Sequence, residues 1–499
     1  MTDDTVAVTA DQAMHIAMDL KGQGKRKEAE IVMRGVLDIE PEHFSALNHL
    51  AALLAEDKKY YEALYRVDRA LKVRKRDKYA ISNRGMILGQ LGHLEESETE
   101  FRRSIHQDES DPVLWNNLGN TLERMGRYSE ALPALNRTLE LDPQRAISYM
   151  NRGIVKMKLF RQHEAIEDLD KAIALNPDIG EAYYNRGIAK LALGDFAGGW
   201  PDYEYRLDIA EGSYYVGPFD QPKWEGHQAL EGKTILLHAE QGLGDSIQFM
   251  RFVPLVLDLG IRHIFMVAHT PLRILTSTDR VTVLKAGEAY PPFDYWCPLM
   301  SLPLAFGTTE DTIPPPWDIR KDQMPERGRR LRVGVCWAGS ENHKNDAHRS
   351  IPLKQFSVLL HTKDIDFFSL QRDIRHSDVA DCSELKHVTV PPMDSVEATA
   401  KAIAMLDLVI TVDTSIAHLA GTLDTPTWIL LPKQSTDWRW MLDREDTPWY
   451  PSAKLFRQTH VGDWESVLAR VKRELAKEVA DNVIWKPRYL PAQTHPAVW

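Results

Sequence analysis

The chain has 499 residues, which is enough for two or three domains with cores of their own. Its 43% hydrophobic and 27% charged residues are typical of a globular protein, and a net charge of −11 gives no electrostatic reason to expect a nucleic acid or an anionic membrane as a partner. Three cysteines without CxxC spacing predict neither a zinc site nor a disulfide framework. The acidic N-terminus does not resemble a signal peptide, and no run of about 18 apolar residues predicts a membrane span, so we expect a cytoplasmic protein.

Residues 10–207 repeat with a period of 34. Small residues recur at the eighth and twentieth positions, where they would let two antiparallel helices approach closely. Those at the eighth position are Ala17, Ala51, Gly85, Gly119, Gly153 and Gly187, and those at the twentieth are Ala29, Ala63, Ser97, Ala131, Ala165 and Gly199. Glycine at the fifteenth position of four copies predicts a turn between the two helices. Six copies in one frame resemble the tetratricopeptide repeat and predict an α-solenoid.

Asparagine recurs at the sixth position of the last four copies, as Asn83, Asn117, Asn151 and Asn185. Asparagine is a poor helix former, so its recurrence inside helices suggests a use. One interpretation is a ladder of side-chain amides that holds an extended acceptor peptide on the concave face of the solenoid. The other is that these amides bond within or between repeats.

The segment 208–232 is rich in glycine, proline and aromatic residues, and we expect it to be a structured connector. Trp200, Tyr203 and Trp224 are the side chains expected to pack the repeat array onto the next domain.

A strand, a tight turn and a helix are predicted within Thr234–Phe249. Gly242 and Gly244 form the turn, where side chains would block both the chain reversal and a ligand approaching the backbone. Asp245 follows as the expected N-cap of the helix and as a carboxylate at the mouth of a crevice, suited to general-base catalysis.

Strands and helices then alternate in two blocks, which predicts two Rossmann-like halves with a cleft between them. The first half covers 233–320, a charged linker follows, the second half covers 331–480, and 481–499 form a tail. Further strands are predicted at Ile264–Ala268, Val281–Leu284, Tyr295–Pro298, Leu331–Trp337, Phe367–Leu370, Leu408–Val412 and Thr427–Leu431, and helices near Leu353–Leu360, Ser395–Met405 and Trp464–Val479.

Two loops of the second half carry candidate donor-binding residues. A buried strand delivers Asp413, Thr414 and Ser415 to a helix N-terminus, where backbone N–H groups and the helix dipole suit a pyrophosphate; plain helix capping is the alternative. His418, one turn further, is more typical of a packed histidine than of a catalyst.

The other loop, Trp337 to Ser340 with Gly339 between them, follows the first strand of this half, where a phosphate-facing loop belongs. Lys344 and Arg349 are candidate charge partners for a leaving diphosphate, although Lys344 also fits a solvated loop cation.

The Trp- and Arg-rich stretch 437–450 suits either stacking of a nucleobase or anchoring of a loop, and we expect a mainly structural role. The Asp-x-Asp pairs Asp168/Asp170 and Asp364/Asp366 do not lie on cleft loops, so no metal site is predicted. There is neither a GxGxxG fingerprint nor a nucleophile elbow, and no cofactor is expected.

Four motifs in order, Glu240–Asp245, Val335–Ser340, Arg349–Pro352 and Asp413–His418, resemble those of the ADP-heptose:lipopolysaccharide heptosyltransferase family. With the repeats in front, the chain resembles bacterial repeat-plus-glycosyltransferase proteins, which include flagellin glycosyltransferases, and its layout is similar to that of O-linked N-acetylglucosamine transferase. The resemblance implies a metal-independent GT-B fold with the donor nucleotide in the C-terminal half.

By this resemblance Asp245 matches the general base, Arg349 matches a lysine that contacts the donor phosphate, and Asp413 begins the diphosphate loop. The family usually has glycine where this chain has Ser415, and the N-terminal half, which normally holds the sugar acceptor, is shorter here. The residues expected to bind the donor are Gly242, Gly244, Trp337, Gly339, Ser340, Asp413, Thr414, Ser415 and His418.

We therefore expect a protein O-glycosyltransferase that uses a nucleotide-activated sugar. The repeats would recruit an acceptor protein, with flagellin suggested by the resemblance alone. Transfer to a lipid-linked or surface glycan, and a repeat scaffold with an inactive transferase domain, are the alternatives.

Overall fold

The computed structural model describes residues 8–209, 219–268, 278–285, 287, 289–317, 330–341, 343 and 345–481. It divides into two compact units, Met1–Asp178 and Ile179–Trp499. The division falls one helix pair before the predicted end of the repeat array at residue 207. Lys344 and residues 482–499 of the predicted tail lie outside the described residues.

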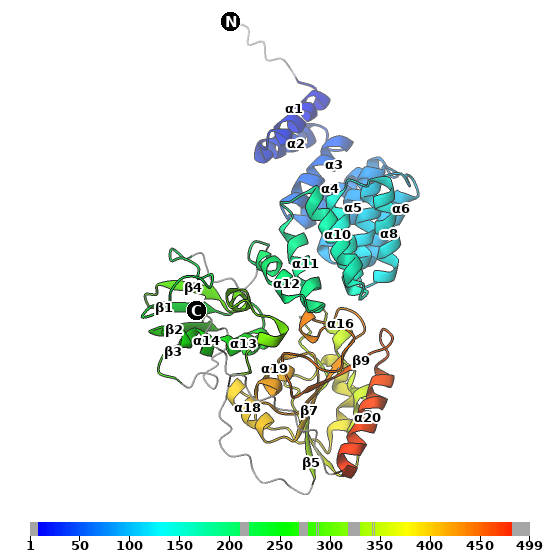
Figure 1. Ribbon diagram of the computed structural model, residues 1–499. Helices are drawn as coiled ribbons and strands as arrows, with labels where there is room; N and C mark the ends of the chain where they lie inside the picture. The colour runs from blue at the N-terminus through cyan, green and yellow to red at the C-terminus, as the bar shows by residue number, and fades with distance from the viewer. Residues whose placement is uncertain are drawn as a thin grey trace. The chain divides into compact units, whose positions relative to one another are not determined.

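The first unit is a stack of antiparallel helix pairs, and its successive helices lie side by side in Figure 1. The first helix of each pair begins at position one of the predicted 34-residue frame. The pairs are α1 (Ala10–Gly22) with α2 (Arg26–Ile39), α3 (Phe44–Glu56) with α4 (Tyr60–Val73), α5 (Lys78–Leu91) with α6 (Leu94–Ile105), α7 (Pro112–Arg124) with α8 (Tyr128–Leu141), and α9 (Ala146–Lys158) with α10 (Gln162–Leu175).

Small residues allow the two helices of a pair to pack closely, as the repeat pattern predicts. A Cβ on Gly119 would lie 2.7 Å from Cγ of Leu135 on the partner helix, which is closer than real Cβ contacts come. The fifteenth position has a positive φ in every copy, including the two copies without glycine there, where φ is 61° at both Lys58 and Phe160. The turn geometry is therefore imposed by the repeat and not by glycine alone.

The second unit begins with the sixth helix pair, α11 (Gly180–Ala192) and α12 (Phe196–Tyr203), followed by the 3-10 helix η1 (Glu204–Leu207). A parallel sheet with strand order β3-β2-β1-β4 comes next. Its elements are β1 (Thr234–His238), α13 (Leu243–Phe249), α14 (Val253–Asp258), β2 (His263–Ala268), β3 (Val281–Lys285), β4 (Tyr295–Pro298) and α15 (Leu302–Ala305).

A second parallel sheet follows, with strand order β6-β5-β7-β8-β9. Its elements are β5 (Leu331–Cys336), α16 (Asp346–Arg349), α17 (Leu353–Phe356), β6 (Ile365–Ser369), α18 (Val396–Ala404), β7 (Leu408–Val412), α19 (Ser415–Thr422), β8 (Thr427–Leu431), β9 (Ala453–Arg457) and α20 (Trp464–Asp481). Apolar residues of α17 and α20 cover one face of this sheet, and those of α18 and α19 cover the other.

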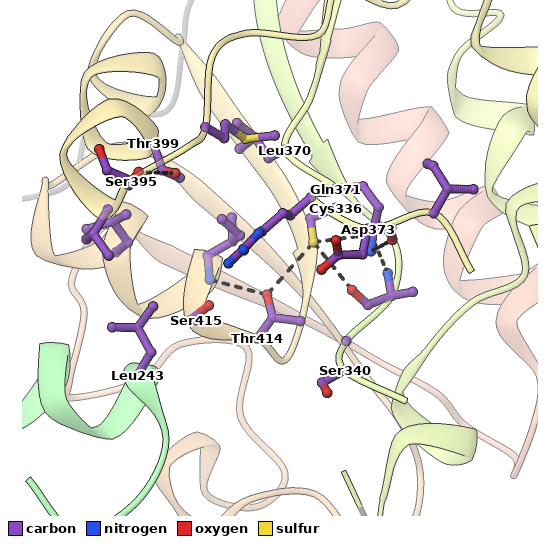
Figure 2. A pocket seen from close by; sticks show the side chains of 18 of the residues that line it. Leu243, Cys336, Ser340, Leu370, Gln371, Asp373, Ser395, Thr399, Thr414 and Ser415 are labelled. Carbon is purple, nitrogen blue, oxygen red and sulfur yellow. Dashed lines mark hydrogen bonds between the residues drawn. The ribbon is translucent and has the colours of Figure 1, made fainter. Parts of the chain in front are cut away.

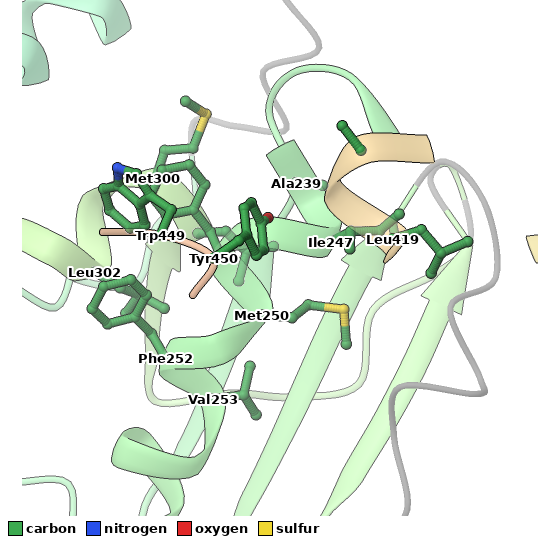
Figure 3. Packing of buried hydrophobic residues seen from close by; sticks show 14 of the residues in the cluster. Ala239, Ile247, Met250, Phe252, Val253, Met300, Leu302, Leu419, Trp449 and Tyr450 are labelled. Carbon is green, nitrogen blue, oxygen red and sulfur yellow. The ribbon is translucent and has the colours of Figure 1, made fainter. Parts of the chain in front are cut away.

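Residues of both sheets belong to one hydrophobic core. Figure 3 shows part of this core, in which Ile247 and Met250 of the first half share a cluster with Leu419 of α19 and with Trp449 and Tyr450 from the connection between β8 and β9. The structure confirms the predicted fold class, an α-solenoid followed by two Rossmann-like α/β halves. Within the described residues no helix is long and apolar enough to cross a bilayer.

We expect opposite effects of alanine at two glycines of the solenoid. Gly126 has a φ of +72°, so Gly126→Ala should lower the free energy of unfolding by about 1–2 kcal/mol. Gly35 lies exposed inside α2 with no atom within 4 Å of an added Cβ, so Gly35→Ala should raise it by about 0.5–1 kcal/mol. Urea unfolding followed by circular dichroism measures both, and a change of the same sign in the two variants would contradict this account.

Candidate functional site

A cavity of about 540 Å³ lies at the carboxyl ends of strands β5, β6 and β7 (Figure 2). The strand order places β6 and β7 on opposite sides of β5, so the cavity is at the point of the sheet where the topology switches direction. Open α/β sheets bind their ligands at this point. Leu243 and Ile247 of α13, in the first half, also line the cavity.

Four of the predicted donor-binding residues line this cavity: Gly339, Ser340, Thr414 and Ser415. Thr414 is the N-cap of α19, because its hydroxyl accepts a hydrogen bond from the Ile416 amide at 3.3 Å. Of the three residues expected at this helix N-terminus, Thr414 is therefore the one that caps the helix. The positive end of α19 adjoins the cavity, which suits an anionic ligand.

Trp337 and Arg349 support these loops and are not among the cavity-lining residues. Trp337 is fully buried, and its indole Nε1 donates to Asp378 at 2.9 Å. Nη1 of Arg349 donates to the carbonyl of Asp413 at 2.8 Å, and its guanidinium lies against Gly339. Arg349 therefore joins the two loops that were predicted to bind the donor.

Asp245 lies near the cavity, two residues from Leu243 and Ile247 in α13. The helix begins at Leu243 with Gly242 as its N-cap, so the expectation that Asp245 would be the N-cap is wrong. The Asp245 side chain is 19% exposed, and its Oδ1 accepts a hydrogen bond from Nη2 of Arg439 at 2.5 Å. Burial raises the pKa of Asp245, and the charge of Arg439 partly opposes this rise.

His418, one turn into α19, is a packed histidine, as the sequence predicted. It lies between the two halves of the α/β region. Its Nδ1 lies 2.9 Å from the hydroxyl of Tyr450, and its ring stacks on Trp440 with centroids 5.4 Å apart. A Cβ on Gly244 would lie 2.6 Å from Cδ2 of His418, so only glycine fits there. Burial lowers the pKa of His418 to about 3, which keeps the imidazole neutral at pH 7.

The carboxyl of Asp413 has a pKa raised to about 6. Burial is the main cause, repulsion by Asp437 adds to it, and the charge of Arg349 opposes it. Asp413 and Asp437 are therefore two interacting carboxyl groups beside the α19 N-terminus. Among the residues that the structure describes, no group of three or more His, Cys, Asp or Glu side chains is arranged to hold a metal ion.

The wall of the cavity that follows strand β6 was not predicted from the sequence. Oε1 of Gln371 accepts hydrogen bonds from the amides of Trp337, at 3.2 Å, and Ala338, at 3.0 Å, and so orders the loop after β5. Arg372 and Arg375 also line the cavity, together with the acidic residues Glu341, Asp373 and Asp394, and Arg375 makes an ion pair with Asp346. The predicted strand Phe367–Leu370 pointed to this wall, since the residues after a strand of a parallel sheet lie at its ligand-binding edge.

Two of the four predicted acceptor-binding asparagines bond between repeats. Nδ2 of Asn83 donates to Oδ1 of Asn48 at 2.9 Å, and Nδ2 of Asn151 donates to Oδ1 of Asn116 at 3.1 Å. In both cases the sixth position of one repeat bonds to the fifth position of the repeat before it. These amides therefore act as bridges between neighbouring repeats.

The other two asparagines differ from this pattern. Nδ2 of Asn185 donates to the carbonyl of Glu181 one turn earlier in α11, at 2.8 Å. Nδ2 of Asn117 is buried and has no hydrogen-bond partner within the described part of the chain. The fifth position of the preceding repeat is Ser82 instead of asparagine, so the bridging acceptor is missing there. Asn117 therefore keeps an amide nitrogen that is buried and unpaired, and a ligand would reach it only if the side chain turned outward.

Family models match three segments of the chain. Residues 112–145 and 146–179 each match the tetratricopeptide repeat, and residues 360–459 match glycosyltransferase family 9 (heptosyltransferase). The last segment holds β6, β7, α19 and β8 and thus much of the cavity wall. The chain carries tetratricopeptide repeats and a glycosyltransferase family 9 domain, which supports glycosyltransferase activity.

Among curated proteins, the chain is 26% identical over 320 residues to protein FlbA of Caulobacter vibrioides, covering 57% of this chain and 53% of that protein. The chain thus spans about half the length of this relative. Among solved structures it is similar to PilF of Pseudomonas aeruginosa, with 17% identity, a TM-score of 0.36, and coverage of 41% of this chain and 93% of the other. It is also similar to the tetratricopeptide protein YrrB, with 22% identity, a TM-score of 0.30, and coverage of 35% and 89%.

Proposed function

We propose that this protein transfers a sugar from a nucleotide-activated donor to a Ser or Thr hydroxyl of a polypeptide held by the repeats. One observation carries the proposal. The cavity at the switch point of the second sheet lies largely in the segment that matches glycosyltransferase family 9, and the helix that closes it from the other half carries Asp245. The volume of about 540 Å³ is in the usual range for small-molecule sites.

In this proposal the donor diphosphate binds at the N-terminus of α19, where Thr414 and Ser415 line the cavity. Arg372 lines the same cavity and can neutralise the charge that grows on the leaving group, whereas the charge of Arg375 is shared with Asp346. Arg349 holds the loops at Gly339 and Asp413 in register, and its expected contact with the donor phosphate stays a prediction. With these groups present, we propose a reaction that needs no metal ion.

Asp245 is the proposed general base. As the acceptor oxygen bonds to the anomeric carbon, its proton passes to the Asp245 carboxylate, and the bond from the anomeric carbon to the diphosphate oxygen breaks. The nucleoside diphosphate then leaves with that electron pair. Burial raises the pKa of Asp245, which makes its carboxylate a stronger base than an exposed aspartate.

The acceptor is proposed to be a polypeptide because solenoids of this kind bind peptides and proteins on their concave face. The first unit adds the unsatisfied amide of Asn117 as a candidate contact. Flagellin is the first protein to test, by the resemblance given above. A cytoplasmic location, where nucleotide sugars are made, agrees with this proposal.

The proposed chemistry is tested by Asp245→Asn, which keeps the shape of the side chain and removes the base. Transfer from a nucleotide sugar to flagellin or to a Ser/Thr peptide, followed by intact mass in the presence of EDTA, should fall by about 100-fold or more. Donor affinity should stay within about threefold, because Asp245 does not line the cavity. Unchanged transfer, or lost donor binding in a folded variant, would contradict the role of Asp245.

The acceptor face is tested by a matched pair of asparagine variants. Asn117→Ala should weaken acceptor binding several-fold and leave the melting midpoint almost unchanged, since Nδ2 of Asn117 makes no hydrogen bond that could be lost. Asn151→Ala removes a bond to Asn116 and should cost about 1 kcal/mol of stability. Acceptor titration and thermal unfolding separate the two effects, and acceptor affinity that is equal in Asn117→Ala and the unaltered protein would rule out this contact.

A further inference from the structure

We propose that Arg439 is a positioning residue, which fixes the Asp245 carboxylate from the opposite half of the α/β region. The sixth helix pair packs against Trp438, the residue next to Arg439. This inference rests on the proposed role of Asp245 as the base, and it adds a residue that neither the motifs nor the family match assigned.

Every nitrogen of the Arg439 guanidinium has an acceptor. Nη2 donates to Oδ1 of Asp245 at 2.5 Å, and Nε donates to Oε1 of Gln248 at 2.5 Å. Nη1 donates to both carboxylate oxygens of Asp437, at 3.0 and 2.9 Å. The Arg439 side chain is 5% exposed, so these bonds are made largely out of water, where a missing partner is costly.

The guanidinium joins two parts of the chain that are far apart in sequence. Arg439 belongs to the 3-10 helix η8 (Trp438–Trp440) after strand β8, whereas Asp245 and Gln248 belong to α13 after strand β1. The guanidinium carbon lies 4.6 Å from the ring centroid of Trp438 and 5.5 Å from that of Phe249. The guanidinium group therefore contacts one aromatic ring from each half. A lysine ammonium would supply neither the planar fork nor the stacking.

The sixth helix pair packs directly behind η8. The Trp438 ring meets Trp200 edge-on at 5.5 Å and Tyr203 at 5.9 Å between centroids. Nε1 of Trp200 donates to the carbonyl of Thr308 at 2.8 Å, which ties the same tryptophan to the first half. The last repeat therefore supports the residue that holds the proposed base.

Several groups face Asp245 and decide how its charge responds to pH. The charge of Arg439 lowers the pKa of Asp245, and the negative charge of Asp437 raises it. His418 on α19 is neutral at pH 7 because burial lowers its pKa to about 3. Burial raises the pKa values of Tyr184 and Tyr203 on the sixth helix pair, so their hydroxyls are also uncharged.

Two variants should therefore move the acid limb of the kcat–pH profile in opposite directions. Arg439→Gln removes the cation, so the Asp245 pKa rises and the limb should move to higher pH by about one unit. Asp437→Asn removes a repelling charge, so the limb should move to lower pH. In Arg439→Gln, kcat should also fall by about 100-fold with the donor KM within about threefold, and Arg439→Lys should restore little of it.

Arg444→Gln is the matched control. Arg444 lies in the same β8–β9 connection and pairs with Asp446 and Glu310 instead of Asp245. It should leave the acid limb in place. The positioning role would be overturned if the acid limb of the kcat–pH profile did not move in Arg439→Gln. It would also be overturned if the limb moved in the same direction in Arg439→Gln and Asp437→Asn.

A second measurement does not depend on transfer activity. The melting midpoint of the full chain should fall when Arg439→Gln is introduced into the unaltered protein. It should fall less when Arg439→Gln is introduced into the Asp245→Asn variant, because the bond between the two side chains is already lost there. Equal losses in both backgrounds would overturn the inference. If the unaltered protein has no transfer activity but the losses differ, the contact stands and the proposed function fails.

Discussion

The two halves of the α/β region meet where α13 and α19 pack together, and this contact depends on the absence of a side chain at Gly244. The imidazole of His418 occupies the space that a Cβ would need, 2.6 Å away. This close approach sets the loop after β1 against the loop after β7. The cavity, with α13 residues in its wall, and the bond between Arg439 and Asp245 both depend on it.

The sixth helix pair follows the repeat frame in sequence yet belongs to the second compact unit. Besides the aromatic contacts of Trp200 and Tyr203, Arg206 in η1 makes a buried ion pair with Glu240, which lies two residues after strand β1. Both N–O distances in this pair are 3.0 Å. Breaking a buried pair leaves an uncompensated charge and costs about 3–5 kcal/mol. The last copy of the repeat frame is therefore a helix pair whose aromatic residues belong to the core of the α/β region. The repeat pattern in the sequence therefore ends one helix pair later than the first compact unit of the structure.

Features that depend on local sequence were predictable. Small residues at fixed positions gave the 34-residue frame, whose first positions, Ala10, Phe44 and their equivalents in later copies, are where helices begin in the structure. Apolar runs gave β4, β7 and β8 with their observed bounds. Strand β9 was missed because its polar residues, such as Lys454, hide the apolar run. The cavity wall at Gln371 and the pair Asp245–Arg439 depend on contacts between residues 34 to 194 positions apart, which no local pattern encodes. Likewise, Asn151 has a hydrogen-bond partner and Nδ2 of Asn117 has none because the fifth position of the preceding repeat is asparagine in one case and serine in the other. A pattern of one recurring residue does not include this second position.

The central claim is that the cavity beside β5, β6 and β7 binds a nucleotide-activated sugar. The most direct test is thermal unfolding of the full chain with UDP, GDP, ADP, CMP and their sugars, each compared with the ligand-free protein. A ligand at about 100 times its dissociation constant stabilises the protein by about 2.7 kcal/mol, which raises the melting midpoint measurably. We expect a clear rise with one nucleotide and its sugar, and a smaller rise in an Arg372→Gln variant. No rise with any of these nucleotides would contradict the donor site and favour a repeat scaffold without transfer activity.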